Sequence, residues 1–431
     1  MTLTLIVAGA TLVLAGGTVI DGYGNEPIPD GIVVVEGDRI LAVGGAGQVI
    51  VPDGAEVIST EGMTVMPGLW DMQVSLMRLG HGDSTRWNET YGPLAERVVM
   101  PIAARQLLQA GVTSARDVAA PLEAAAHVRA RVRERIIDGP DIYVSGPALR
   151  KLAPAGTAAW QWEVDGAGDV RDKVGRLANA GVDYVLLADV EMWTAEELAA
   201  VVSESRIRGL PVHAYAEKPA DVVRGAAAQL DGFLGTDMGT APFPAEAMQA
   251  VTGRLTQAGA RPLAWTPAIS ALLNLESLKR NDEPLDDPRA TELLPELVAA
   301  DVRGSLASLE SVAASEMPAG RSDSLCDKLR QLDEAKVLLL LGSGAGLPAH
   351  LHSRATWQEI DFWVRQCGLP AVRAIRAATH DAATAMGVGH ESGAISPGKI
   401  ADIIAVRGDV LRNPGLLQSV DVVVKRGRRV R

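Results

Sequence analysis

The 431-residue sequence is poor in aromatic residues and in cysteine, and it has no long apolar segment. No apolar stretch reaches the roughly 20 residues that a membrane-spanning helix needs, so we expect no membrane-embedded part. The two cysteines, Cys326 and Cys367, have no CxxC neighbour, which excludes the common zinc and dithiol motifs. We therefore predict two reduced thiols in a cytoplasmic protein.

Clusters of basic residues are lacking as well. The net charge is −12, and the basic tail "VVVKRGRRVR" is short and follows a strand-like run. An acidic chain without a basic stripe argues against nucleic acids and anionic membrane surfaces as partners. The apolar N-terminus "MTLTLIVAGATLVLAGG" has no positively charged region before it. Paired β-strands are therefore favoured there, with a signal peptide as the alternative.

Both ends of the chain are rich in short β-like runs. Residues 1–66 contain "TLIVAGA", "TLVLAGGTVI" and "GIVVVEGDRILAVG", separated by Gly, Pro, Asp and Asn. Residues 395–431 have the same texture in "GKIADIIAVRG" and "VDVVVKRGRRV". Apolar runs bounded by turn residues are typical of strands. The two ends therefore predict one small β-sandwich formed by segments 1–66 and 395–431.

The sequence pattern changes between residues 67 and 394, where short apolar runs alternate with helix-like segments. Alternation of this kind predicts an α/β fold with parallel strands, and eight runs predict a TIM-like (β/α)8 barrel. In such barrels the chemistry lies at the C-terminal ends of the strands. The runs are "TVMPGLWDMQVSL", "GVTSARDV", "DIYVSGPAL", "VDYVLLADV", "LPVHAYA", "LDGFLGT", "RPLAWTPA" and "AKVLLLLGSGA".

Several motifs resemble the amidohydrolase superfamily, particularly its imidazolonepropionase and prolidase-like branch. "VMPGLWDM" and "AGVTSARDV" resemble the first two barrel strands of that family. The segment "AIRAATHDAATAMGVGHESGAISPGKIADIIAV" resembles its closing segment. The resemblance implies a barrel beside a β-sandwich. It also implies one or two divalent ions, which would lower the pKa of a bound water and polarise a carbonyl.

The metal ligands implied by this resemblance are replaced in the sequence. The family carries His-x-His on strand one, a carboxylated Lys or a Glu on strand four, His on strands five and six, and Asp on strand eight. The matching positions here are Gln73, Ser75, Leu186, Tyr215, Leu234 and Gly344. Leu and Gly offer no ligand, and Gln and Ser are poor zinc ligands. The aspartate is also the general base in the family. We therefore predict neither a metal nor another cofactor.

Two groups of residues remain as candidates for the site. The apolar replacements and the tryptophans on loops suggest a pocket for an apolar small molecule. Hydrogen-bonding and acidic groups near strand ends could act as acid or base, because burial raises the pKa of a carboxyl group. We expect substrate contacts from Gln73, Ser75, His81, Trp160, Trp162, Leu186, Leu234, Trp265, Ser343 and His350. We expect catalytic groups among Tyr215, Asp117, Asp189 and His213.

Three functions are compatible with these residues. The favoured one is a metal-independent enzyme of secondary metabolism that cyclises, eliminates or isomerises an apolar small molecule by acid/base chemistry. The first alternative is a non-catalytic pseudoenzyme that binds a ligand or a partner protein. The second is a hydrolase with a relocated metal, for which "HLH" at 350–352 has suitable spacing. The substrate is not specified, and a homo-oligomer stays open.

Overall fold

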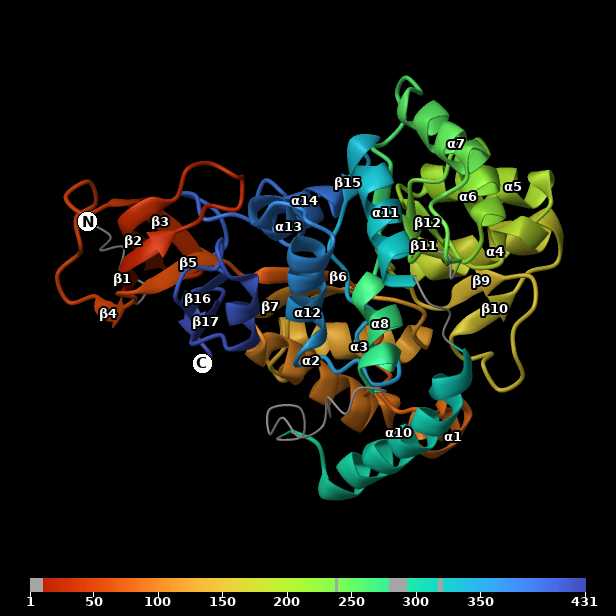
Figure 1. Cartoon of the computed structure of the whole chain (residues 1–431), viewed down its shortest axis with the longest axis horizontal. Helices are drawn as coiled ribbons and strands as arrows, with labels where there is room; N and C mark the ends of the chain where they lie inside the picture. Colours follow the sequence, from red (N-terminus) through yellow and green to blue (C-terminus); the bar gives the residue numbers. More distant parts are fainter. Residues whose placement is uncertain (1–10, 237–238, 279–292, 317–320) are drawn as a thin grey trace, which may run out of the picture. The chain divides into compact units, whose positions relative to one another are not determined.

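The computed structural model describes residues 11–236, 239–278, 293–316 and 321–431 (Figure 1). The chain divides into two compact units. The first comprises Met1–Trp70, Leu108–Thr113 and Leu369–Arg431, and the second comprises Asp71–Leu107 and Ser114–Gly368. The strand expected at "TLIVAGA" lies outside the described residues. Within those residues, no helix is long and apolar enough to cross a membrane.

The first unit is built around one sheet that contains strands from both ends of the chain. Its order is β18-β17-β16-β5-β1-β2-β3, with β4 paired to β1. Figure 1 shows β16 and β17, in blue, beside the red and orange N-terminal strands, and β16 pairs antiparallel with β5. The strands are β1 Thr11–Val19, β2 Ile28–Glu36, β3 Arg39–Gly45, β4 Glu56–Ser59, β5 Met63–Pro67, β16 Ile403–Arg407, β17 Val422–Lys425 and β18 Arg428–Arg429.

The alternation of apolar side chains along these strands explains why the N-terminal and C-terminal segments form one sheet. Leu12 and Leu14 of β1 pack with Val33 of β2, and Ile403 and Val422 from the C-terminal segment complete the same apolar cluster. Because side chains alternate across a strand, each strand contributes one apolar face to this core. The predicted β-sandwich from the two termini is confirmed. Helices α13 (Ala371–Ala377) and α14 (His380–Ala385) also belong to this unit.

Parallel strands dominate the rest of the chain, and each of the eight predicted apolar runs contains one. They form a sheet β6-β7-β8 and a sheet β10-β9-β11-β12-β13-β14-β15. β6 and β7 begin in the first unit and end in the second. The strands are β6 Leu69–Val74, β7 Val112–Asp117, β8 Asp141–Val144, β9 Ala148–Arg150, β10 Gln161–Glu163, β11 Val185–Leu187, β12 Val212–Tyr215, β13 Gly232–Leu234, β14 Ala264–Thr266 and β15 Leu338–Leu339.

Backbone hydrogen bonds join the two parallel sheets at both edges. The Met72 N–H donates to the Leu341 carbonyl at 2.8 Å, which links β6 to the segment after β15. The Asp183 N–H donates to the Val144 carbonyl at 2.8 Å, which links β8 to the segment before β11. The strands therefore follow one another in barrel order, although the described ladders are two sheets and not one closed sheet. The predicted TIM-like α/β fold is confirmed.

Helices follow the barrel strands. α1 begins with a side-chain cap, Asp83, whose carboxylate accepts a hydrogen bond from the Arg86 N–H, and α5 begins with Thr194, whose hydroxyl accepts from the Glu197 N–H. The helices of the second unit are α1 Ser84–Tyr91, η1 Gly92–Leu94, η2 Ala95–Val99, α2 Met100–Gln109, α3 Leu122–Arg133, α4 Gly166–Asn179, η3 Val190–Met192, α5 Ala195–Ile207, α6 Pro219–Ala227, α7 Ala245–Leu255, α8 Ile269–Leu278, α10 Glu296–Glu316, α11 Arg321–Glu334, α12 Ala355–Asp361 and η4 Phe362–Gln366.

The two cysteines correct one prediction from the sequence. Cys326 of α11 and Cys367, which ends η4, form a disulfide. Both residues are almost fully buried. The expected pair of reduced thiols is therefore wrong, because the fold brings together two cysteines that lie 41 positions apart in the sequence.

Candidate active site

The register of the barrel strands decides which side chains face the interior. Tyr215 of β12 pairs with Leu234 of β13, and Leu234 pairs with Thr266 of β14. Paired residues of parallel strands point to the same side of the sheet. Trp265 therefore points to the opposite side, where its ring packs against Phe233 at 4.8 Å. The expected orientation of Trp265 toward the pocket is wrong, and Thr266 occupies the inward position.

A cavity of about 300 Å³ lies at the C-terminal ends of the barrel strands. Its position agrees with the rule that such barrels place their sites at this edge. Four residues expected at the site line it: Gln73, Ser75, Trp160 and Tyr215. The cavity also has a polar side that the sequence did not reveal, formed by Arg78, Arg150 and Glu217. Val118, Ala148 and Leu347 contribute apolar walls.

Arg78 lies in the loop that follows β6. The Arg78 N–H donates to the Ser75 carbonyl at 3.1 Å, and the Leu76 N–H donates to Asp117 Oδ1 at 2.9 Å. These bonds fix the loop against the end of β7. Arg78 lines the cavity, and its guanidinium has no hydrogen-bond or ion-pair partner among the described residues. Burial lowers the pKa of Arg78, but a guanidinium keeps its charge.

Asp117 therefore supports the loop from outside the cavity lining. Its side chain is 1% exposed, and its Oδ2 has no hydrogen-bond partner within the described parts of the chain. Burial raises the pKa of Asp117 to about 7, although the hydrogen bonds from the Leu76 and Val118 N–H groups lower it. Its expected role as a catalytic acid stays a prediction, but the geometry gives it a structural contact.

Arg150, at the end of β9, is held by two partners. Its guanidinium donates to both carboxylate oxygens of Asp189 at 2.8 Å, and to Gln161 Oε1 at 2.7 Å. Asp189 has a left-handed backbone with φ of 53°, which is uncommon outside glycine but tolerated by aspartate. The charge of Arg150 is thus matched by Asp189, and this carboxylate orients a residue that lines the cavity.

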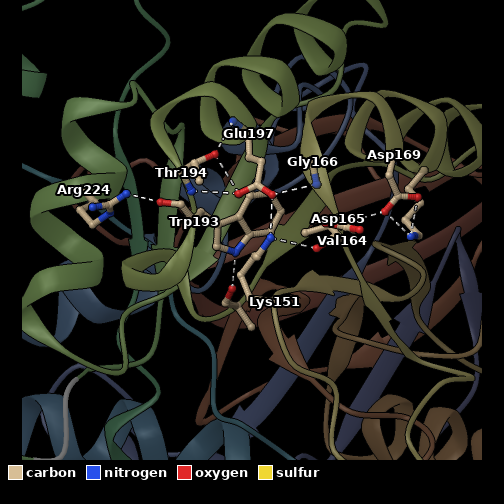
Figure 2. A network of polar contacts seen from close by, with 11 residues as sticks. Lys151, Val164, Asp165, Gly166, Asp169, Trp193, Thr194, Glu197 and Arg224 are labelled. Atoms are coloured by element: carbon tan, nitrogen blue, oxygen red, sulfur yellow. Dashed lines mark hydrogen bonds and ion pairs between the residues drawn. The ribbon is translucent and has the colours of Figure 1, made fainter.

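A second polar network anchors the loop that carries Trp160 and Gln161 (Figure 2). Lys151, just after β9, donates to Glu197 Oε1 at 2.6 Å and to the Val164 carbonyl at 3.0 Å. Glu197 also accepts the Gly166 and Thr194 N–H groups. Burial raises the pKa of Glu197, but these hydrogen bonds outweigh burial and lower the pKa to about 2. The loop is therefore tied at both ends to the starts of α4 and α5.

Tyr215 is the last residue of β12, Glu217 lies two residues beyond it, and both line the cavity. The Tyr215 hydroxyl has no hydrogen-bond partner among the described residues, and burial raises its pKa, so the phenol stays protonated. Glu217 remains accessible to solvent. Burial first, and then the charges of Asp189 and Asp221, raise the pKa of Glu217 above its usual range. These two residues are a hydrogen-bond donor and a group able to exchange protons with water.

The barrel interior contains a buried guanidinium. Arg116 of β7 is 1% exposed and donates to the Met72 carbonyl at 2.7 Å and to Thr266 Oγ1 at 3.0 Å. Its Nη1 lies 3.2 Å from His213 Nδ1. Burial, and then the charge of Arg116, lower the pKa of His213 well below its usual value. His213 is therefore a neutral interior residue that accepts from Arg116, and it does not line the cavity.

Two buried polar atoms at the cavity lack partners. Gln73 is 7% exposed and its Oε1 makes no hydrogen bond within the described residues. Trp160 is 5% exposed and its Nε1 is likewise without a partner there. Buried polar groups are paired in the great majority of cases, so each such exception requires an explanation. Both residues line the cavity, which leaves a ligand or water as the missing partner.

The remaining expected substrate contacts do not line the cavity. Leu186 and Leu234 lie next to it, in a buried cluster with Tyr184 and with two residues of the cavity wall, Val118 and Ala148. The Ser343 hydroxyl donates to Asp71 Oδ2 at 2.6 Å and so turns away from the cavity. His81 Nε2 lies 3.5 Å from Asp301 Oδ2, His350 Nε2 lies 3.2 Å from Ser270 Oγ, and the Trp162 ring stacks with Arg176.

These contacts correct the expected positions of these side chains, but they do not test whether the residues bind a substrate. The sequence missed Arg78, Arg150 and Glu217 because each lies in a loop or at a strand end without a recognisable motif. Glu217 had one usable signal, since it lies two residues beyond Tyr215 in the same strand-to-helix connection.

The residues at the strand ends do not fit a divalent metal ion. The positions that the sequence pattern matches to metal ligands hold Gln73, Ser75, Leu186, Tyr215, Leu234 and Gly344. Within the described ranges, no group of three or more His, Cys, Asp or Glu residues could hold a metal ion. His352 is fully buried, and burial lowers its pKa to about 3, as it does for His350. We therefore derive no chemistry through a metal.

Gly344 lines the cavity at one of these positions through its backbone. It has φ of 75°, and a Cβ atom there would lie 3.1 Å from the Ala271 Cβ and 3.2 Å from Leu347 Cδ1. Glycine is the residue that adopts this backbone without strain. The fold therefore requires a residue without a side chain at this position.

The chain is similar to several hydrolases of known structure. A Xaa-Pro dipeptidase with methionine bound in its active site has 23% identity and a TM-score of 0.77, covering 97% of this chain and 99% of that chain. The A. niger ochratoxinase has 20% identity and a TM-score of 0.72, with 98% and 95% covered. Molinate hydrolase has 20% identity and a TM-score of 0.74, with the same coverage. No curated protein sequence matches the chain.

The sequence model of the amidohydrolase family matches residues 304–430. This range includes β15, the segment after it in which Gly344, Ala345 and Leu347 line the cavity, and the C-terminal strands of the first unit. The solved structures extend the similarity of fold to nearly the whole chain. Residues 304–430 thus match the model of the amidohydrolase family, and the fold over nearly the full length is the one seen in these solved hydrolases.

Proposed function

We propose that the cavity at the strand ends is an active site in which a small molecule is converted by proton transfer without a metal ion. The observation that supports this most is the pair Tyr215 and Glu217, which line one cavity from the same strand end. One is a phenol that stays protonated, and the other is a carboxyl group whose pKa is raised. Acid/base catalysis works best when such a pKa moves toward the working pH.

The two residues have separate roles. The Glu217 carboxylate removes a proton from a carbon atom of the substrate and returns a proton to the same or a neighbouring atom. The Tyr215 hydroxyl donates a hydrogen bond to the substrate oxygen on which negative charge develops. In an isomerisation the returned proton completes the reaction. In an elimination the leaving group departs and takes up the returned proton, and in a cyclisation the carbanion attacks an internal carbonyl carbon, whose oxygen takes up that proton. Because Glu217 is accessible to solvent, its proton exchanges with water between turnovers.

The walls favour a ligand with an apolar body. Val118, Ala148 and Leu347 line the cavity together with the ring of Trp160. Aromatic and aliphatic walls with a few polar groups are typical of small-molecule sites. The proposal keeps the metal-independent chemistry expected from the sequence, with Tyr215 retained and Glu217 added as the proton carrier.

Deuterium exchange tests the proposal even when the product is unidentified. The purified protein, treated with a chelator, is incubated in D₂O with a library of small carbonyl compounds, and mass spectrometry follows deuterium uptake and new products. We expect exchange at carbon in at least one compound. Tyr215→Phe and Glu217→Gln should each slow it by roughly 10²–10⁴-fold.

Three results would contradict the proposal. These are exchange that appears only after zinc is added, exchange that both substitutions leave unchanged, and products of amide or ester hydrolysis alone. Arg171→Gln, at an exposed position of α4, is the matched control and should behave as the wild type.

A further inference from the structure

We infer that the ligand of this cavity is an organic monocarboxylate that also carries an N–H or O–H donor, with Arg78 binding its carboxylate. The inference rests on the proposed function and specifies the substrate class of the same site. Four observations carry it: the uncompensated charge of Arg78, the buried charge of Arg116, and the partnerless polar atoms of Trp160 and Gln73.

The charge of Arg78 is the first. Two guanidinium groups line the cavity, and Arg150 is already paired with both oxygens of Asp189. Arg78 contacts no carboxylate among the described residues. A partly buried guanidinium without a counter-ion is costly, and a planar carboxylate satisfies it through two parallel hydrogen bonds. The cavity therefore has one vacant position for an anionic group.

Arg116 adds a second positive charge, from within the barrel. Its hydrogen-bond partners are the Met72 carbonyl, Thr266 and His213, all of which are neutral. No carboxylate lies within ion-pair distance of it in the described parts of the chain. A low-dielectric interior screens such a charge weakly. The positive charge of Arg116 reaches Tyr215 on the cavity lining, so it favours an anionic ligand there.

Trp160 and Gln73 define the rest of the ligand. The Trp160 indole N–H can only donate, so its missing partner is an acceptor such as a second carboxylate oxygen. Gln73 Oε1 can only accept, so its missing partner is an N–H or O–H group. Since both atoms are buried, leaving them unpaired is costly, and a ligand that pairs them removes this cost.

Size and charge distinguish a carboxylate from a phosphate. At about 300 Å³ the cavity is at the small end of the usual range of ligand pockets. It offers a single unpaired cation, and Glu217 on the same lining would repel a dianion. A monocarboxylate with a phenyl-sized body matches this set of charges and walls.

Binding of three probes tests the inference. L-3-phenyllactate carries the carboxylate, the hydroxyl donor and an apolar ring, L-3-phenyllactamide is its neutral match, and phenyl phosphate is the dianion. We expect calorimetric titration of the wild-type protein to show phenyllactate binding at least about tenfold more tightly than either other probe. Arg78→Gln should abolish this preference, Arg78→Lys should keep part of it, and Trp160→Phe should weaken it. Arg171→Gln should bind as the wild type, and circular dichroism verifies the fold of each variant.

Binding and turnover can fail separately. If the amide binds as well as the acid, if phenyl phosphate binds best, or if Arg78→Gln keeps the preference, the inference is wrong, whatever the deuterium-exchange test shows. If phenyllactate binds through Arg78 and no compound exchanges deuterium, the inference holds and the proposed proton transfer is wrong.

Discussion

Arg150 and Asp189 are joined by two parallel hydrogen bonds, from Nε to Oδ2 and from Nη2 to Oδ1, each 2.8 Å long. This fork geometry is the strongest way for a protein to hold an arginine. It leaves Arg150 at the cavity wall in one orientation and occupies both oxygens of Asp189. A carboxylate engaged in this way is a poor general acid and a good positioning group.

The first prediction follows from this pair. Asp189→Asn keeps the size of the side chain but removes the charge that holds Arg150. We expect the deuterium exchange to slow by less than about tenfold, against roughly 10²–10⁴-fold for Glu217→Gln. The pH profile of exchange should keep its shape, because the proton carrier is unchanged. A loss in Asp189→Asn as large as that in Glu217→Gln would make Asp189 a catalytic residue.

The second prediction concerns the pH dependence of carboxylate binding. Burial, Asp189 and Asp221 raise the pKa of Glu217, while Arg150 and Lys218 oppose the shift. Below that raised pKa Glu217 is neutral, and above it the residue repels an anion. The affinity for phenyllactate should therefore fall as pH rises through the pKa of Glu217. Calorimetric titrations at a series of pH values should show this fall in affinity for the wild type and no change in affinity for Glu217→Gln. The same pH dependence in both proteins would show that the charge of Glu217 does not affect carboxylate binding.

The third prediction concerns Asp117 and stability. Burial raises the pKa of Asp117 from 3.8 to about 7 in the folded state. Between these values the unfolded chain releases this proton and the folded chain keeps it, so stability is lost as pH rises from about 4 to 7. Asp117→Asn removes this contribution. Urea unfolding should show the variant gaining roughly 1–4 kcal/mol relative to the wild type between pH 4 and pH 8. A constant difference would show that Asp117 is ionised in the folded protein.

The fourth prediction concerns the guanidinium inside the barrel. Arg116→Lys retains the charge but cannot reach the Met72 carbonyl, Thr266 and His213 together, because an ammonium lacks the planar fork. We expect a loss of roughly 2–4 kcal/mol in the free energy of unfolding. The exposed control Arg171→Gln should change it by less than about 0.5 kcal/mol. A small loss in Arg116→Lys would show that the interior has room to rearrange.

The fifth prediction concerns the disulfide. Titration of the denatured, unreduced protein with a thiol reagent should detect no free thiol among Cys326 and Cys367. Replacing both by serine should lower the free energy of unfolding by about 2–4 kcal/mol, because a bond across 41 residues restricts the unfolded chain. Detection of both thiols in freshly purified protein would contradict the bond.

Strand positions could be predicted from the sequence much better than strand faces. All eight apolar runs contain a barrel strand, because burial on both sides requires continuous apolar residues between turn signals. β14, however, has only three residues, Ala264–Thr266, and a slip of one residue exchanges Trp265 for Thr266 on the inner face. The alternation of side chains between the two faces of a strand cannot be determined reliably from a run of so few residues.

The polar side of the cavity was beyond prediction for another reason. Arg78 follows β6 in a loop, and its role depends on having no partner, which only the fold reveals. The same holds for Cys326 and Cys367, since distance along the chain says nothing about proximity in space. In contrast, Gln73, Ser75 and Tyr215 line the cavity, and each lies at or next to the end of a strand whose position was clear from the sequence.

The left-handed backbone at Gly344 limits which residues the cavity lining can carry at this position. Any side chain there would adopt a conformation that costs roughly 1–2 kcal/mol and would press against Ala271 and Leu347. Leu347 is itself part of the cavity lining, so a larger residue at position 344 would have to displace a neighbouring wall of the cavity. The shape of the cavity on this side therefore depends on one residue having no side chain.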